Sequence, residues 1–348
     1  MAKTYKVGVA ALVHDHVWGE MGHWKSLPNV ELVAAGDVNT PLRKRAQAAG
    51  IVRVYDSWQE MLEKEDLDIV QAASENSVGA DIVEVCAAKG IHVISEKPMA
   101  ATLAQADRML RASEAAGTRL LINWPTAWSP AIQEWERRLL AGDIGAITYL
   151  KYRSAHNGPK EIGCDPFFYE WLYDAEKNGA GALMDYCGYS ANMNARFLGV
   201  PLQVTGMRGV FVKDYPVPDD NAIILMKYAH AFGVAEASWT QTVPYAEGAN
   251  PIAYGTGGSL SVAGDKVVWQ RPGHPAETIA PAAPTAPHRS GPEYLLHCLE
   301  TGAAIEGFCS AQVSRDTQEI LEAGLRSADT GQTQTLPLQA LPPPIMGE

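Results

Sequence analysis

Residues 6–22 read KVGVAALVHDHVWGEMG, and the order of elements in this stretch decides the fold predicted for the chain. The short apolar run over residues 5–11 is typical of a buried parallel strand, and a helical pattern begins near His16. A strand, a turn and a helix in this order open a dinucleotide-binding domain, whose turn usually carries the glycines of G-x-G-x-x-G. Here Ala11 and Val13 stand in the turn, so the stretch keeps the context of such a site without its glycine motif.

The first 123 residues continue to alternate short apolar strands with helices. Further strands are predicted over residues 30–38, 68–74, 92–98 and 119–124. Helices are predicted over residues 16–26, 41–50, 57–66, 77–90 and 103–117. This alternation predicts an α/β fold, with a doubly wound parallel sheet covered by helices on both faces. We therefore predict a dinucleotide-binding Rossmann domain over residues 1–123.

The pattern changes after Trp124, because strands with period-two alternation follow one another without intervening helices. These strands are predicted over residues 146–156, 201–212, 221–241 (as a hairpin) and 259–271, and helices over residues 131–142, 291–302 and 311–331. The pattern indicates a C-terminal α+β domain with a large, mainly antiparallel open sheet. We assign it to residues 124–335, for substrate binding and oligomerisation, and treat residues 336–348 as a proline-rich tail.

The composition narrows the classes of function. With 348 residues, 47% hydrophobic and 20% charged, the chain is typical of a globular protein of two domains. The net charge of −12 argues against nucleic-acid binding, and no apolar run of about 18 residues could span a membrane. No signal peptide precedes the first strand, and five scattered cysteines without a C-x-x-C pair indicate reduced thiols, so we expect a cytoplasmic protein. His14 and His16 have no further ligands nearby in sequence, and no metal site is predicted.

Asp37 stands at the end of the second predicted strand. An acid at this place hydrogen-bonds the adenosine ribose hydroxyls and repels a 2′-phosphate, which favours NAD over NADP. Arg43 and Lys44 follow closely and leave NADP open as an alternative. The small side chains of Ala10 and Ala11 would still let a pyrophosphate approach the helix N-terminus. Asp37 could instead only cap its loop, and the sequence leaves both interpretations open.

The strongest functional pattern is HVISEKPMA, residues 92–100. Glu96, Lys97 and Pro98 follow a buried strand at the carboxyl edge of the sheet, where open α/β folds bind ligands. A lysine there could hydrogen-bond a substrate hydroxyl, and desolvation would lower its pKa. Proline fixes the turn, with a cis peptide bond as one option. A plain surface turn is the alternative, but the position at the strand end favours function.

Two further stretches strengthen this interpretation: GDIGAITYLKYR at residues 142–153 and NGAGALMDYCGYSANMNARFLG at residues 178–199. Together with the E-K-P turn, they resemble the Gfo/Idh/MocA family of dinucleotide-dependent oxidoreductases over nearly the whole chain. That family commonly shows G-G-G-x-L-x-D-x-G-x-H-x-x-D in the last stretch. The resemblance implies a Rossmann domain, a nicotinamide cofactor and oxidoreductase activity.

On this sequence the first aspartate of the family pattern is Asp185 and the E-K-P lysine is Lys97. Cys187 replaces the middle glycine, Tyr189 the histidine and Asn192 the second acid. Members related to glucose-fructose oxidoreductase and dihydrodiol dehydrogenase also have tyrosine at the histidine position. The resemblance therefore implies a shift of the acid/base role to Tyr189 rather than a loss of activity.

The chemistry of these side chains agrees with that assignment. Hydride transfer from a carbinol carbon requires a base for the hydroxyl proton, and tyrosine, with a pKa of about 10, is a poor base at neutral pH. The ammonium of Lys97 would lower the pKa of Tyr189, and Asp185, four residues earlier on the same helix face, would orient substrate or lysine. Tyr189 as a core residue and Asp185 as a helix N-cap are the alternatives.

The remaining predicted site residues come from the ends of strands. The cofactor is expected to contact Ala11, Val13, His16, Asp37, Ser74, Asn76, Glu96, Lys97 and Asn123. The substrate is expected to contact Trp124, His156, Asn157, Asp185 and Tyr189, because aromatic faces stack on sugars and polar groups bind vicinal hydroxyls.

We therefore predict an NAD(P)-dependent oxidoreductase that transfers a hydride between a sugar or cyclic polyol and the nicotinamide. One alternative is a glycoside-cleaving enzyme that oxidises its substrate transiently and returns the cofactor unchanged. Another is a non-catalytic dinucleotide-binding regulator. The open sheet also predicts a homodimer or homotetramer, because one of its faces would otherwise expose apolar side chains.

Overall fold

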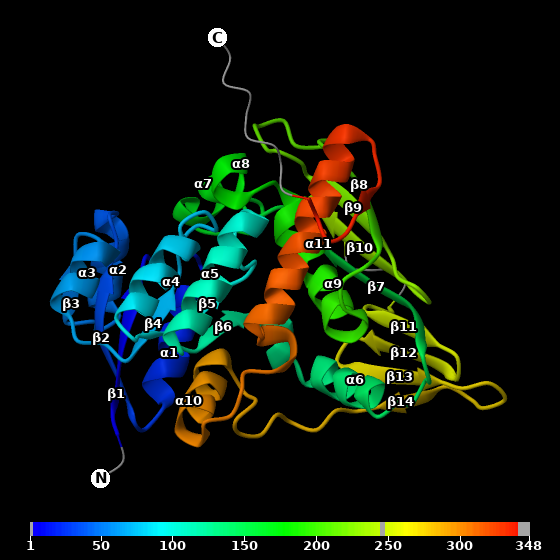
Figure 1. The fold of residues 1–348 in the computed structure, drawn as a ribbon, viewed down its shortest axis with the longest axis horizontal. Coiled ribbons are helices and arrows are strands. Elements are labelled where there is room, and N and C mark those ends of the chain that lie inside the picture. The colour runs from blue at the N-terminus through cyan, green and yellow to red at the C-terminus, as the bar shows by residue number, and fades with distance from the viewer. Residues whose placement is uncertain (1–2, 244–247, 340–348) are drawn as a thin grey trace.

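Six parallel strands form the N-terminal sheet in the computed structural model, which describes residues 3–243 and 248–339 (Figure 1). They are β1 (Tyr5–Ala10), β2 (Val30–Gly36), β3 (Arg53–Tyr55), β4 (Ile69–Ala72), β5 (His92–Glu96) and β6 (Leu120–Asn123). Their order is β3-β2-β1-β4-β5-β6, so the direction of winding reverses between β1 and β4. Ligands of doubly wound sheets bind at the carboxyl ends of the strands next to such a reversal.

Five helices connect these strands: α1 (Val17–Ser26), α2 (Thr40–Ala48), α3 (Trp58–Lys64), α4 (Gly79–Ala88) and α5 (Leu103–Ala116). The predicted Rossmann domain is confirmed, with element ends that differ from the prediction by a few residues. The short strand β3 was not predicted, since three residues carry too little periodicity. The predicted cap of α3 forms, because the Ser57 hydroxyl accepts a hydrogen bond from the backbone N–H of Glu60 at 3.1 Å.

The second sheet has nine strands in the order β14-β13-β12-β11-β7-β10-β9-β8-β15. They are β7 (Ile147–Ala155), β8 (Gln203–Gly209), β9 (Asn221–Lys227), β10 (Phe232–Ser238), β11 (Ile252–Gly255), β12 (Gly258–Ala263), β13 (Lys266–Gln270), β14 (Glu277–Ile279) and β15 (Gln334–Thr335). Neighbouring strands are antiparallel except for β7 and β10, which pair in parallel. The mainly antiparallel open sheet of the prediction is thus confirmed.

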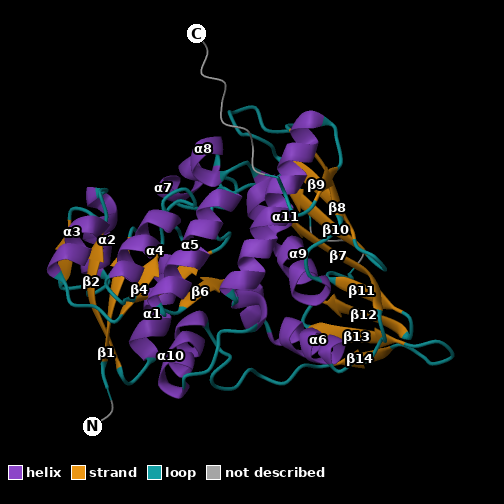
Figure 2. Ribbon diagram, in the orientation of Figure 1, coloured by secondary structure: helices purple, strands orange, loops and turns teal. Residues whose placement is uncertain are grey.

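Helices cover one face of this second sheet (Figure 2). α6 (Pro130–Leu140), α9 (Ala182–Leu198) and α11 (Ala311–Thr330) pack against it, and the short helices α7 (Pro166–Leu172) and α8 (Ala175–Asn178) lie toward the first domain. α9 packs across β7 and β10, at the middle of the sheet. It carries Asp185 and Tyr189 of the sequence pattern.

The C-terminal part of the chain returns to the first domain. α10 (Gly291–Thr301) packs against β5, β6 and α1, and α11 packs against α5. The last two helices of the predicted domain 124–335 thus pack on the Rossmann domain and share its core. The predicted tail begins in contact with the body, because the Leu338 N–H donates to the Glu319 carboxylate at 2.7 Å, and residues 340–348 lie outside the described residues.

Within the described parts of the chain, none of the helices is long and apolar enough to cross a lipid bilayer. The five cysteines, all within those parts, are unpaired.

Candidate functional site

A buried ion pair joins the two domains at the carboxyl end of β5. The Lys97 ammonium donates to Asp185 Oδ1 at 2.5 Å, and both side chains are almost completely buried. The ring of Tyr189, one helical turn after Asp185, lies with its centre 5.0 Å from Lys97 Nζ. The Lys97–Pro98 peptide bond is cis, as one option of the sequence analysis had it. The structure thus brings together the three residues that were predicted to be catalytic.

The charges in this cluster differ from the prediction in one respect. Burial alone would lower the pKa of Lys97, but the Asp185 carboxylate and the Tyr189 hydroxyl outweigh it and raise that pKa above its usual value. Burial also raises the pKa of Tyr189, although Lys97 acts in the opposite direction. The expected lowering of the two pKa values is therefore wrong for the protein without a bound ligand. At neutral pH Lys97 is therefore charged and Tyr189 carries its proton.

The first turn of α9 is held by a carboxylate from the second sheet. Asp219 accepts hydrogen bonds from the backbone N–H groups of Gly181 at 3.0 Å and Leu183 at 2.7 Å, and Arg208 pairs with it at 3.2 Å. A side chain at Gly181 would collide with the Asp219 backbone, since its Cβ would lie 2.2 Å from the carbonyl oxygen. Asp219 therefore sets the position of the helix that presents Asp185 and Tyr189.

Glu96, the residue before Lys97, anchors a second polar cluster. Its carboxylate contacts His16 Nδ1 at 2.9 Å and accepts from the Asn123 amide at 3.0 Å. His14 lies next to His16 and is fully buried, and burial holds its pKa well below the usual value. His14, His16 and Glu96 form the single group of three potential metal ligands in the described residues; Glu96, far from the two histidines in sequence, contacts the His16 ring, and the His14 ring accepts from the backbone N–H of His16 at 3.3 Å.

A cavity of about 430 Å³ lies between the two domains, beside the turn after β1. Its Rossmann side includes Ala11, Val13, Asp37 and Ser74, all of which were predicted to contact the cofactor. Phe167, Glu170, Trp171 and Lys177 of the second domain form the opposite wall. These are the surroundings that the adenosine half of a dinucleotide needs, with a narrow backbone turn, an acid and apolar walls.

Ala11 takes the place of a motif glycine in conformation as well as in sequence. Its φ is 61°, the only positive value among the described residues other than glycine, and its N–H donates to the Gly36 carbonyl at 2.9 Å. The left-handed conformation costs an L-residue about 1–2 kcal/mol. The turn therefore keeps the backbone path of a glycine-rich loop, and alanine adds only one methyl group to it. A dinucleotide fits these residues.

Asp37 holds the turn, as one of the two interpretations has it, and its place on the cavity wall keeps the ribose-binding interpretation open. Its carboxylate accepts from the backbone N–H groups of Leu12 at 2.7 Å and Asn39 at 2.6 Å, so it holds the turn, and it lines the cavity. Arg43 donates to the Asp37 carbonyl at 2.8 Å and pairs with Asp56 at 2.9 Å. Because its guanidinium already has these partners, Arg43 is a poor receptor for a 2′-phosphate, and the arrangement favours NAD.

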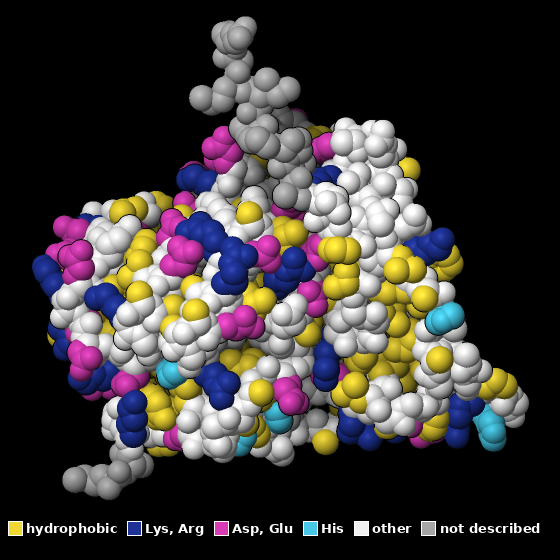
Figure 3. Space-filling model, viewed as in Figure 1, with side chains coloured by type: hydrophobic (Ala, Val, Ile, Leu, Met, Phe, Trp, Pro, Cys, Tyr) yellow, Lys and Arg dark blue, Asp and Glu magenta, His cyan; other side chains and the backbone are white. Residues whose placement is uncertain are grey.

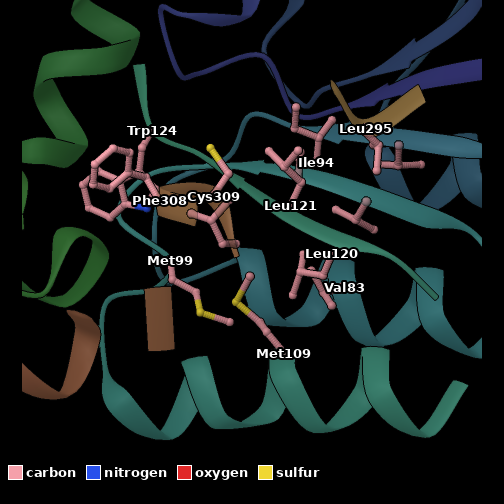
Figure 4. Close-up of a cluster of buried hydrophobic side chains, with 14 of the residues drawn as sticks. Val83, Ile94, Met99, Met109, Leu120, Leu121, Trp124, Leu295, Phe308 and Cys309 are labelled. Carbon is pink, nitrogen blue, oxygen red and sulfur yellow. The ribbon is translucent and has the colours of Figure 1, made fainter. Parts of the chain in front are cut away.

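Three of the predicted contact residues also have structural partners. The Asn76 amide donates to Asn178 Oδ1 at 2.8 Å and holds α8, and Asn123 supports Glu96. Trp124 is fully buried, donates to the Ser314 hydroxyl at 3.1 Å, and lies in the core cluster beside Phe308 (Figure 4). Its ring lies 5.6 Å from that of Tyr189. The prediction of Trp124 as a wall of the substrate pocket needs correction: the side chain is too deep for that and backs Tyr189.

The other predicted substrate residues lie around the catalytic cluster. The ring centres of His156 and Tyr186 lie 4.7 Å apart, and burial lowers the pKa of His156, although the Asp185 carboxylate acts in the opposite direction. The Asn157 carbonyl accepts from Lys213 at 2.5 Å. Tyr186 and Cys164, which the sequence did not single out, also lie near these residues, and burial raises the pKa of the Cys164 thiol to about 11. Only the neighbourhood of Tyr186 to Asp185 in sequence could have indicated the first, and nothing indicated the second.

Comparison with known proteins agrees with this geometry. Residues 8–124 match the model of an oxidoreductase family with an NAD-binding Rossmann fold, and residues 132–261 match the GFO/IDH/MocA C-terminal domain. The chain is 38% identical to a D-apiose dehydrogenase from Paraburkholderia graminis over 38% of this chain and 36% of that protein. It is 24% identical to the scyllo-inositol 2-dehydrogenase (NAD(+)) of Bacillus subtilis over 68% of this chain and 67% of that protein. The matched part thus spans about a third of the first relative and two thirds of the second.

Solved structures share the fold over almost the whole chain. An oxidoreductase from Agrobacterium radiobacter in complex with NAD+, L-tartaric acid and magnesium superposes with a TM-score of 0.80 at 20% identity, covering 96% of this chain and 98% of that one. A levoglucosan dehydrogenase in complex with NADH and levoglucosan reaches 0.79 at 17% identity, covering 96% and 100%. At these identities the likeness establishes the fold.

The strain at Ala11 leads to a first prediction. Ala11→Val should lower the free energy of unfolding by about 1–2 kcal/mol, because a β-branched residue tolerates the left-handed conformation still less than alanine. It should also weaken NAD binding, since the larger side chain points into the turn. Urea unfolding and calorimetric titration with NAD measure the two effects. Ala11→Gly is the matched control and should keep both the stability and the NAD affinity of the wild type. If Ala11→Gly loses as much of either as Ala11→Val, the left-handed turn at Ala11 is not the cause.

The buried ion pair leads to a second prediction. Asp185→Asn should lower the free energy of unfolding by about 3 kcal/mol, because it leaves the Lys97 ammonium buried without a counter-charge. The double variant Lys97→Met/Asp185→Leu should lose clearly less, since it removes both charges. Urea unfolding of the cofactor-free protein compares the two. If the double variant is as unstable as Asp185→Asn, the unpaired charge of Lys97 is not the cause of the lost stability.

Proposed function

Since the chain belongs to the Gfo/Idh/MocA family of oxidoreductases with an NAD-binding Rossmann domain, we propose that it is an NAD-dependent dehydrogenase or reductase of sugars or cyclic polyols. The observation that carries this proposal is the buried Lys97–Asp185 pair beside Tyr189, at the sheet edge that also borders the inter-domain cavity. The D-apiose, inositol and levoglucosan dehydrogenases among its relatives support the substrate class.

The residues around the cavity would hold the dinucleotide. The turn at Ala11 leaves room for the pyrophosphate near the start of α1, and the Asp37 carboxylate would accept from the adenosine ribose hydroxyls. Phe167 and Trp171 would cover the adenosine from the second domain. When bound, the nicotinamide supplies the acceptor or donor of the hydride.

The protein's own side chains would bind the substrate oxygen and transfer its proton. Lys97 would donate a hydrogen bond to this oxygen and stabilise the negative charge that develops on it in either direction of the reaction. Tyr189, protonated at neutral pH, would give a proton to the oxygen of a ketone or aldehyde during reduction. During oxidation Tyr189 would first have to release its own proton to solvent; the phenolate, stabilised by the Lys97 ammonium, would then accept the proton of the substrate hydroxyl. Asp185 keeps Lys97 charged and in place.

The decisive experiment is a screen of D-apiose, D-xylose, inositols and levoglucosan with NAD and NADP, read by the absorbance of the reduced nucleotide. We expect NAD to be reduced to NADH in the presence of at least one of these substrates. Tyr189→Phe should lower kcat by a factor of about 10²–10⁴, because it removes the proton donor and acceptor but keeps the ring. Tyr254→Phe, on the exposed side of β11, is the matched control and should leave kcat unchanged.

Other outcomes of this screen would overturn the proposal. Cleavage of a glycoside without net reduced nucleotide would show the transient-oxidation alternative. NAD binding without turnover of any substrate, unaffected by Tyr189→Phe, would show a dinucleotide-binding regulator. If calorimetry detects no binding of either nucleotide, both the enzyme and the regulator are excluded.

We also propose that the uncovered face of the nine-stranded sheet is the interface of a homodimer or homotetramer. Met207, Leu225, Phe232 and Tyr254 point to this face from β8, β9, β10 and β11, and between 46% and 69% of each is exposed. Hydrophobic side chains gather over this part of the molecule in the space-filling view (Figure 3). Helices cover only the opposite face, and a second copy of the chain would bury the same apolar side chains on both molecules, so a second copy is the partner we propose.

Light scattering after size-exclusion chromatography tests this proposal. The wild-type protein should have at least twice the mass of 37.5 kDa of one chain. Leu225→Glu/Phe232→Glu should dissociate it into monomers, because two carboxylates would be buried in an apolar interface. Val52→Glu, at an exposed site of the Rossmann domain, is the control and should keep the assembly. A monomeric wild-type protein would refute the proposed interface.

A further inference from the structure

A second cavity, of about 490 Å³, lies on the other side of the core from the dinucleotide turn. Its walls come from α6, from the end of α9, from α10, and from two short 3₁₀ helices, η1 (Pro125–Trp128) and η2 (Gly307–Cys309). Neither the hydride-transfer chemistry nor the dinucleotide cavity uses these residues. The volume falls within the range of small-molecule sites, about 300–1,000 Å³, and suits a ligand of two sugar rings.

One wall of this cavity is aromatic. The rings of Trp128 and Tyr294 have their centres 6.0 Å apart, and that of His288 lies 5.2 Å from Tyr294. The Tyr294 hydroxyl is fixed in place because it accepts from the Glu306 N–H at 3.1 Å. Such a ledge of ring faces offers an apolar surface on which the C–H faces of a sugar can stack.

The other wall carries an ion pair. Arg196 donates from Nε to Glu136 at 3.0 Å, and burial raises the pKa of Glu136 although Arg196 opposes this. The second oxygen of Glu136 and the terminal nitrogens of Arg196 remain acceptor and donors for a ligand. The neighbouring Arg137 is occupied, because it pairs with Glu134 at 2.8 Å. A wall with one carboxylate and one guanidinium favours neutral hydroxyls over an anion.

A chain of hydrogen bonds connects this cavity with the dinucleotide turn. The Trp128 indole N–H donates to Asn123 Oδ1 at 2.9 Å, and the Asn123 amide donates to Glu96 Oε1 at 3.0 Å. The other Glu96 oxygen contacts His16 at the start of α1, and Lys97 is the next residue. A ligand that stacks on Trp128 and shifts its indole therefore acts, through Asn123 and Glu96, on groups next to both the dinucleotide turn and Lys97.

We propose that this cavity is a second saccharide site, distinct from the catalytic cluster, which takes a neutral disaccharide and is coupled to dinucleotide binding through Trp128, Asn123 and Glu96. The saccharide stacks on Tyr294 and Trp128 and places its hydroxyls against the Glu136–Arg196 pair. The binding part of this inference stands without the proposed function, whereas the coupling part rests on it, because it requires that the chain binds NAD.

Calorimetric titration of the full chain with maltose and cellobiose tests the site, with succinate as an anionic comparison. At least one disaccharide should bind with a Kd on the order of 1 mM, and succinate should not. Tyr294→Ala should weaken this binding about tenfold or more, because it removes the centre of the aromatic ledge. Tyr294→Phe keeps the ring and is the matched control, which should bind nearly as the wild type does. Binding of NAD should be the same in both variants.

The coupling is tested by measuring the Kd of NAD with and without the saturating disaccharide. It should change about fivefold or more, and NAD should change the Kd of the disaccharide by the same factor, as linkage requires. Trp128→Phe keeps a ring on the ledge but has no N–H for Asn123. It should bind the disaccharide nearly as well and lose the change in NAD affinity.

Each other result overturns a defined part of the inference. If no disaccharide binds, if succinate binds instead, or if Tyr294→Ala binds as tightly as the wild type, the cavity is not a saccharide site. If Trp128→Phe retains the full coupling, the hydrogen-bond chain does not transmit it. A protein that binds a disaccharide at Tyr294 but no NAD would refute the proposed function and the coupling, and would leave the site established.

Discussion

The arrangement of this protein depends on the need to neutralise one buried cation. Lys97 directly follows strand β5 of the Rossmann sheet, where the surrounding backbone and side chains exclude water. An ammonium in such a place is stable only next to a negative charge, and Asp185 from the second domain supplies it. The ion pair therefore fixes how α9 approaches the first sheet. Asp219, which caps α9, and Trp124, which backs Tyr189, serve the same alignment from two sides.

The dinucleotide turn shows how a motif can disappear while its geometry persists. Ala11 keeps the left-handed backbone that a glycine would adopt, and Asp37 binds the neighbouring N–H groups. The second domain contributes as well, since the Trp171 indole donates to the Val13 carbonyl at 3.4 Å and Asp165 pairs with Arg45 at 3.2 Å. The surroundings of this turn are thus completed by both domains, although the sequence pattern lies in one of them.

Burial and charge act against each other throughout the catalytic cluster. The unliganded protein holds Lys97 charged and Tyr189 neutral, which suits donation of hydrogen bonds to a substrate oxygen. The cost of burying a carboxylate also explains the hydrogen bonds behind Glu96, which accepts from Asn123, while Asn123 in turn accepts from Trp128. A buried carboxylate needs several donors, and these donors link the catalytic edge with the distant cavity.

The sequence by itself determined the fold class and most of the longer elements, and it singled out Lys97, Asp185 and Tyr189, which the structure places together. Hydrophobic period and capping residues are local signals, and Lys97 at a strand end and Asp185 four residues before Tyr189 are placed by one strand and one helix. Only the tertiary structure decided that Asn76 clamps α8, that Trp124 is core, that β7 and β10 pair in parallel, and that the pKa values of Lys97 and Tyr189 rise. These properties arise from contacts between residues far apart in the chain, because burial and electrostatic environment belong to the packed molecule and not to any single segment.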